Sequence, residues 1–199
     1  QGFNVRQVIE WLPKDKPEEI TLDAADRAIE AQRVHKAKFI VGDSNGVGRG
    51  AMEYLAKYFH QEHPDLGVTV IFFNAGAKAL DDKRYYLRRD ELWHKHGRPF
   101  FANPRTHLLK TPGLKAQLSA PGYHEDTNKK LWVESKDDIY KRTGQRSGNG
   151  GDAVLQTLLV DATPEKPKEE PRSEHPPVFQ KHFDRLQRQE DLASGKYIR

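Results

Sequence analysis

The residue with the clearest chemical potential is an aspartate set between an apolar strand and a glycine-rich turn. Asp43 follows the apolar residues 39–41, which predict a buried strand, and precedes a turn rich in glycine at residues 46–50. Open α/β sheets bind their ligands at the carboxyl ends of such strands. Glycines, together with the free amides of a helix expected to begin near Val47, leave room for a bulky anion. We therefore expect Asp43 to act as a metal ligand or a catalytic acid.

Other interpretations of this turn stay open. A phosphate-binding loop carries lysine and then serine or threonine after its last glycine, whereas Gly48 is followed by Arg49 and a further glycine. The dinucleotide-binding fingerprint also fits poorly, because its last glycine is wrongly spaced and Asp43 would repel a pyrophosphate. Nucleotide binding by this loop is thus the weaker alternative. A purely structural alternative is that Asp43 opens an Asx-turn and the glycines only shape a tight loop.

A second aspartate, Asp152, has a related setting. It lies in the first turn of a helix expected at residues 152–160, directly after a glycine-rich loop at residues 144–151. In a sheet flanked by helices, Asp43 and Asp152 can meet at one edge. Two carboxylates there would bind Mg²⁺ or Mn²⁺, because hard cations prefer oxygen ligands and keep waters for substrate and nucleophile. This arrangement suits phosphodiester hydrolysis by two metal ions.

Composition narrows the possible ligands and partners. The chain has 199 residues, no cysteine and 36% apolar residues, so any metal must be bound by oxygen or histidine. His94 and His96 cannot share one face of a helix, and a zinc site is not expected there. The net charge of +4 favours a polyanionic partner. No run of eighteen apolar residues exists, so no membrane segment is expected.

The elements that must position the aspartates alternate along the chain. Strands are predicted at residues 5–11, 39–41 and 68–73; helices are predicted at residues 21–29 behind a Thr21 cap, after the glycine turn, and at residues 81–96. This alternation predicts βαβ units and a mainly parallel sheet. A helical piece at residues 108–118, a hairpin at 123–133 with its turn at 126–129, and a short helix at 137–142 are expected to follow.

Composition changes after residue 160. Five prolines among alternating charges at residues 163–177 predict an extended linker. Beyond it, Phe179, Phe183 and Leu186 recur at helical spacing, and so short a helix is expected to dock on another surface. We therefore predict one domain at residues 1–160 and a flexible tail at residues 161–199.

Four motifs in order resemble a known family. Residues 40–50 (IVGDSNGVGRG), 78–93, 131–139 and 141–153 are similar to the C-terminal nuclease domain of the large terminase subunit of tailed double-stranded DNA bacteriophages. The resemblance spans residues 1–160. It implies a ribonuclease H-like α/β fold, with a mixed central sheet flanked by helices. It also implies a Mg²⁺- or Mn²⁺-dependent endonuclease that cuts concatemeric double-stranded viral DNA.

The family also implies a set of acidic ligands. Such domains use an acid on the first strand, one at the end of a later strand and one near the start of a C-terminal helix. Asp43 matches the second and Asp152 the third. The first-strand acid has no counterpart, because the chain is expected to begin at a later strand. The family usually carries proline and aspartate after the position of Ser147, whereas this chain has Gly148 and Asn149, so that further carboxylate is absent.

Other charged residues are candidates for the same site. Glu134 could reach it from a strand end as a catalytic acid, with Lys136 holding a phosphate; alternatively, both belong to a surface salt-bridge pattern that caps the next helix. Arg142 and Arg146 flank the loop before Asp152 and are expected to contact DNA phosphates. Two hairpin lysines, Lys129 and Lys130, are weaker candidates for DNA contact. Arg84, Arg88 and Arg89 could also follow a DNA backbone, although charges on a helix usually form its solvated face.

The leading hypothesis is therefore the metal-dependent nuclease domain of a viral DNA-packaging motor. The family implies an ATPase domain elsewhere in the protein, portal protein and small terminase subunit as partners, and action in the host cell cytoplasm at the procapsid portal. No Walker motif occurs in this chain. The alternative from another class is a non-catalytic module that docks on the portal or the small subunit through Phe179, Phe183 and Leu186.

Overall fold

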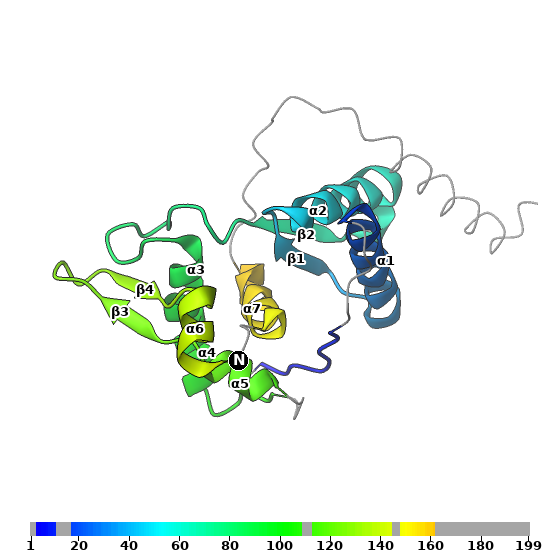
Figure 1. Cartoon of the computed structure of the whole chain (residues 1–199). Coiled ribbons are helices and arrows are strands. Elements are labelled where there is room, and N and C mark those ends of the chain that lie inside the picture. The colour runs from blue at the N-terminus through cyan, green and yellow to red at the C-terminus, as the bar shows by residue number, and fades with distance from the viewer. Residues whose placement is uncertain (1–2, 11–16, 109–112, 145–147, 162–199) are drawn as a thin grey trace, which may run out of the picture.

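The computed structural model describes residues 3–10, 17–108, 113–144 and 148–161. At its centre, β1 (Phe39–Asp43) pairs in parallel with β2 (Thr69–Phe73), and Asp43 lies opposite Phe73 at the carboxyl ends of both strands. Helices cover the two faces of this sheet (Figure 1). The predicted parallel pairing and the position of Asp43 at the end of its strand are confirmed.

One face of the sheet packs against α1 (Pro17–His35) and α2 (Val47–Lys57), which continues as the π-helical turn η1 (Tyr58–Glu62). Alternate strand residues point to this face, because successive side chains of a strand face opposite sides. Ile40 and Phe72 thus join a core built on Ala25, Leu55 and Phe59. The helix expected after the glycine turn is confirmed. A 3-10 turn, η2 (Pro64–Leu66), then leads into β2.

The opposite face carries the C-terminal helix. Val41 and Phe73 belong to a second core with Val154 and Leu155. These residues come from α7 (Asn149–Gln156), which continues as the 3-10 turn η4 (Thr157–Asp161). The buried helix expected from residue 152 therefore begins three residues earlier, and Asp152 lies in its first turn as predicted.

The remaining elements form the part of the molecule that carries the β-hairpin (Figure 1). They are α3 (Arg88–Glu91), the π-helix η3 (Leu92–Gly97), α4 (Arg98–Ala102), α5 (Leu114–Ser119), β3 (Tyr123–Glu125), β4 (Leu131–Val133) and α6 (Lys136–Thr143). The hairpin is antiparallel, and its turn is closed by a hydrogen bond from the Lys129 amide to the Asp126 carbonyl, as the sequence predicts. The predicted helix at residues 137–142 is confirmed as α6.

Three local predictions are wrong. The described residues 5–10 form no strand. Within residues 3–10, the β-bridge is made by Asn4, which pairs with His107. The helix expected from Asp81 begins at Arg88, because a bridge between Lys78 and Leu87 holds residues 78–87 in a turned segment. Thr21 is buried inside α1 and does not cap it. The tail at residues 162–199, with Phe179, Phe183 and Leu186, lies outside the described residues.

Candidate metal and nucleic-acid site

Asp43 holds the chain as it leaves β1. Its Oδ1 accepts the backbone amide of Asn45 at 3.0 Å, which forms the Asx-turn raised as the structural alternative. The Asn45 side chain donates to Oδ1 of Asn74 at 3.0 Å, beside the end of β2. These bonds join the carboxyl ends of the two strands. Oδ1 of Asp43 is therefore engaged locally, and the half-buried carboxylate stays at the sheet edge.

The glycines after Asp43 have a packing role. A Cβ on Gly48 would collide with the carbonyl oxygen of Asp43, so only glycine lets the first turn of α2 come so close to the strand. Gly46 has φ of 54°, in the left-handed region that favours glycine. The structure thus accounts for both residues without a bound nucleotide. The same close approach sets the N-terminus of α2 beside Asp43.

Asp152 is held by two donors from different elements. Its Oδ1 accepts the indole Nε1–H of Trp93 at 3.3 Å, and its Oδ2 lies 3.3 Å from the ammonium Nζ of Lys136. Lys136 also donates to the side-chain oxygen of Asn149 at 3.3 Å. The Asp152 side chain keeps 20% exposure. A partly exposed carboxylate is therefore already presented to a cation.

The helix that carries Asp152 is fixed against α5. Oε1 of Gln117 accepts the Gly151 amide at 2.8 Å, in the first turn of α7. A Cβ on Gly148 would collide with the Gln117 side chain, and one on Gly150 would lie 2.7 Å from Glu10. Gly148, Gly150 and Gly151, which the sequence places in a loop before the helix, instead let α7 begin against α5.

The structure brings together the elements that carry the two aspartates. Helix α7 packs on β1, and Val41, two residues before Asp43, shares a core with Val154, two residues after Asp152. Within the described ranges, no group of three or more His, Cys, Asp or Glu side chains could hold a metal ion. Carboxylate oxygens nevertheless suit Mg²⁺ or Mn²⁺, which take further ligands from water and substrate. The Lys136 ammonium on Asp152 shows that this carboxylate accepts a neighbouring cation.

Glu134 is buried and engaged by Arg142. Arg142 donates through Nε to Oε1 at 3.0 Å and through an Nη to Oε2 at 2.6 Å, while the Gly122 amide donates to Oε2 at 3.0 Å. The Arg142 hydrogen bonds, followed by the Gly122 amide, lower the pKa of Glu134 from 4.5 to about 2. Glu134 and Arg142 thus tie β4 and α6 to the segment before the hairpin. Their roles in catalysis and phosphate contact stay predictions that require this pair to open.

Comparisons with known proteins bear on the fold. No protein-family model matches the chain, and no curated protein sequence matches it significantly. Solved structures do match. A lysine-to-alanine variant of the nuclease domain of the large terminase subunit gp2 of bacterial virus Sf6, with manganese and beta-thujaplicinol, has a TM-score of 0.61 and 17% identity over 78% of this chain and 77% of that one.

Two further structures of the same Sf6 protein agree. The nuclease domain without the substitution has a TM-score of 0.54, and the variant gp2c with calcium has a TM-score of 0.55; each is 15% identical over 78% of this chain and 77% of that one. The chain has the fold of a terminase nuclease domain. This is the predicted ribonuclease H-like α/β fold, which is thereby confirmed.

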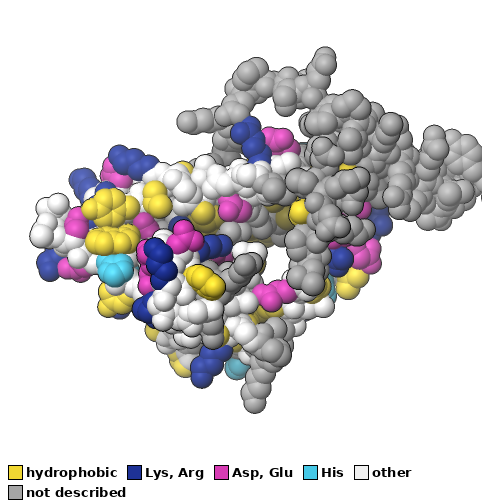
Figure 2. Space-filling model, viewed as in Figure 1, with side chains coloured by type: hydrophobic (Ala, Val, Ile, Leu, Met, Phe, Trp, Pro, Cys, Tyr) yellow, Lys and Arg dark blue, Asp and Glu magenta, His cyan; other side chains and the backbone are white. Residues whose placement is uncertain are grey.

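On this terminase-nuclease fold, two of the other predicted DNA contacts, Lys129 and Lys130, lie side by side on the hairpin and have partners there. Lys130 lies 4.1 Å above the ring of Tyr86, and Lys129 pairs with Glu125 at 2.8 Å on the hairpin. Hydrophobic and basic side chains gather over the end of the molecule that holds the hairpin (Figure 2). Arg146 lies outside the described residues. DNA contact by these three residues therefore stays a prediction.

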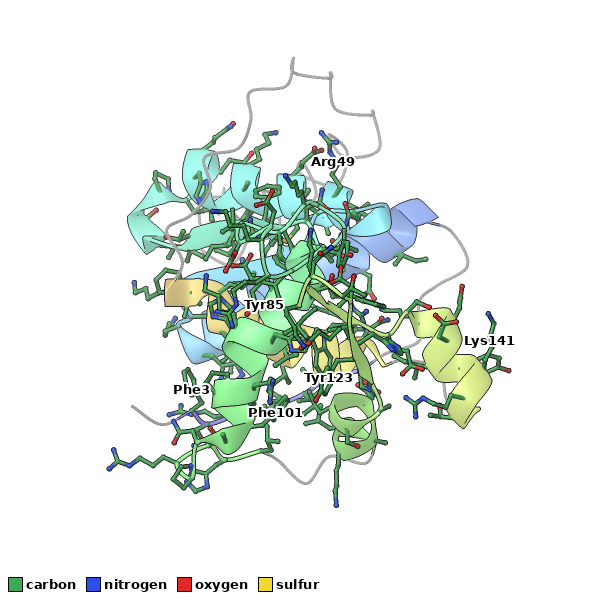
Figure 3. All side chains as sticks on the ribbon, turned by 90° about the vertical axis from the view of Figure 1, so that its left-hand side faces the viewer. Phe3, Arg49, Tyr85, Phe101, Tyr123 and Lys141 are labelled. Carbon is green, nitrogen blue, oxygen red and sulfur yellow. The ribbon has the colours of Figure 1, made fainter. Side chains whose placement is uncertain are left out.

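The histidines of η3 form no metal site with each other. His94 is buried between Tyr85, stacked at 6.0 Å, and Tyr123, edge-on at 5.4 Å (both tyrosines are labelled in Figure 3). Burial, followed by the nearby charge of Arg98, lowers the pKa of His94. His94 is therefore an uncharged packing residue of this fold at neutral pH.

Two residues of the site were missed by sequence reasoning. Trp93 reaches Asp152 across 59 positions, and nothing in the local pattern points to that contact. Asp90 is 2% exposed and accepts the Leu87 and Val133 amides, each at 2.8 Å, so it fastens the hairpin to α3. Asp90 falls within the helix predicted at residues 81–96, where a charged residue gives no sign of burial.

Proposed function

We propose that this chain is the metal-dependent endonuclease domain of a viral DNA-packaging motor, and that it cuts concatemeric double-stranded DNA. The observation that carries the proposal is the placement of Asp43 at the end of β1 and of Asp152 in the first turn of α7, on elements that pack together in a terminase-nuclease fold. The Sf6 neighbours with manganese and calcium support a divalent cation.

Asp43 and Asp152 would hold Mg²⁺ or Mn²⁺, and two such ions would supply Lewis acidity for hydrolysis of a phosphodiester. Asp152 contributes Oδ2, which already faces the Lys136 ammonium. Asp43 contributes its carboxylate from the sheet edge, where the Asx-turn fixes its direction. Two anionic side chains on rigid elements keep the site geometry before DNA arrives.

Lys136 is suited to bind a phosphate next to the cleaved bond. Its side chain is 51% exposed, so the ammonium can turn from Asp152 toward DNA without unpacking the core. The half-exposed Arg142 lies on the same helix, α6. Contacts of this kind address the DNA backbone and carry no sequence information. We therefore propose cleavage with little base preference and binding that weakens strongly with salt.

The wider setting is also part of the proposal. The chain would act with an ATPase domain of the same protein, beside the portal and the small terminase subunit, in the host cell cytoplasm at the procapsid. No helix in the described part of the chain is long and apolar enough to cross a bilayer. The division into a nuclease domain at residues 1–160 and a docking tail at 161–199 belongs to the same proposal.

Metal soaking tests the site directly. Crystals of the chain soaked in Mn²⁺ should show anomalous density between Asp43 and Asp152, and crystals of Asp152→Asn should lose it. Crystals of Asp65→Asn, which changes an exposed aspartate of η2, should keep the density. If crystals soaked in both Mn²⁺ and ATP show nucleotide density at the amides of residues 46–50 and none between Asp43 and Asp152, the nucleotide-binding alternative is supported instead.

A further inference from the structure

We propose that Trp93 is a positioning residue for the metal site, and that its indole N–H fixes the Asp152 carboxylate so that Oδ2 is presented to a divalent cation. This inference rests on the proposed function and assigns a role to a residue that does not touch the reacting atoms. It begins from the unequal partners of the two Asp152 oxygens: a neutral indole donor on Oδ1 and a cation on Oδ2.

The indole donor is held firmly. Trp93 packs against the core that contains Leu155, which lies three residues after Asp152. A Cβ on Gly97 would lie 3.3 Å from Leu155, so η3 and α7 are in close contact. The Trp93 carbonyl accepts the Arg98 amide in a π-helical turn, a local geometry that is frequent at functional sites. Movement of the partly buried ring away from Oδ1 would disturb this packing.

The cation on the other oxygen is held loosely. The Lys136 side chain is 51% exposed; it forms an ion pair with Asp152 and donates a hydrogen bond to Asn149. Because the lysine of the pair is half exposed to solvent, the ion pair contributes little to stability. A divalent ion can therefore replace the ammonium at Oδ2, while Trp93 keeps its hold on Oδ1. The indole N–H also has no acceptor capacity, so it cannot compete for the cation.

A variant that keeps an aromatic side chain and removes the N–H donor tests this role. Trp93→Phe should weaken Mn²⁺ binding by roughly 10-fold, the scale seen when a ligand loses its outer hydrogen bond. The readout is free Mn²⁺ measured by electron paramagnetic resonance during a titration of the full chain. Trp132→Phe, in the hairpin strand β4, is the matched control and should bind Mn²⁺ as the wild type does. Equal Mn²⁺ affinity of a folded Trp93→Phe variant and the wild type would overturn the inference.

A second measurement does not depend on the folding of that variant. In ¹⁵N-labelled wild-type protein, the indole N–H resonance of Trp93 should shift on addition of Mg²⁺ and in Asp152→Asn, while that of Trp132 stays in place. An unmoved Trp93 resonance in both cases would also overturn the inference. If Asp152→Asn abolishes Mn²⁺ binding but Trp93→Phe does not, the proposed metal site stands and only the positioning role falls. Unchanged Mn²⁺ binding by Asp152→Asn would instead remove the metal site itself.

Discussion

Lys136 and Asp152, which are sixteen positions apart, meet with Nζ 3.3 Å from Oδ2. The pair joins the start of α6 to the first turn of α7. The lysine is half exposed and the aspartate is largely covered, so the ammonium can move more easily than the carboxylate. The pair therefore combines a fixed anion with a movable cation, as the proposed site for a metal and a phosphate requires.

Lys136→Ala should weaken DNA binding at all sequences alike. Loss of one phosphate contact should lower the slope of log affinity against log salt concentration by about 0.9. The measurement is fluorescence anisotropy of a labelled duplex over a range of salt, made with and without Ca²⁺, so that Lys136 is also tested after a divalent ion has replaced it on Asp152. Lys141→Ala is the matched control, because Lys141 lies on the same helix and is 76% exposed (Figure 3). Equal salt slopes for the two variants would exclude a phosphate contact by Lys136.

The Glu134–Arg142 pair should stabilise the fold in a pH-dependent way. The folded-state pKa of Glu134 is about 2, below its ordinary value of 4.5. Its contribution is therefore fully present above pH 4.5 and is lost as the pH falls toward 2. Thermal unfolding should show Glu134→Gln melting below the wild type at pH 7, with the gap narrowing from pH 4.5 downward.

The control for that experiment is Glu53→Gln, which removes an exposed pair with Arg49 on α2. Its melting temperature should stay close to that of the wild type at every pH, because exposed ion pairs contribute little. A Glu134→Gln gap that is constant from pH 7 to pH 3 would show that the carboxylate charge is not what stabilises this part of the fold.

Asp90 should be a stability residue. Asp90→Ala leaves the part-buried Leu87 amide and the buried Val133 amide without their acceptor, which should lower the free energy of unfolding by roughly 2 kcal/mol. Urea denaturation measures this change, with Glu30→Ala on the exposed side of α1 as a near-neutral control. A loss as small as that of Glu30→Ala would mean that the hairpin is held by other contacts.

Local pattern was enough to predict the framework of the site. The apolar run before Asp43 and the helical periodicity after it are set by neighbouring residues, and so is the place of Asp152 in the first turn of its helix. The sheet pairing followed from the alternation of strands and helices. These features depend on residues close in sequence, which explains their success.

Contacts between distant segments could not be predicted in this way. The residue types of Glu134 and Arg142 suggest separate roles, yet the fold pairs the two side chains with each other. Trp93 and Asp152 meet only because η3 packs on α7. Residues 81–87 have helical character, but the bridge between Lys78 and Leu87 overrides it. In each case the folded arrangement determines which residues meet, and their spacing in the sequence does not indicate the contact.

Metal-dependent cleavage of plasmid DNA tests the central claim most directly. With Mn²⁺ or Mg²⁺, the chain should convert supercoiled plasmid to nicked and linear forms, and chelation should stop the reaction. Asp43→Asn and Asp152→Asn should each abolish cleavage, whereas Asp65→Asn should cut as the wild type does. Undiminished cutting by either of the first two variants would contradict the assignment of the metal site to Asp43 and Asp152.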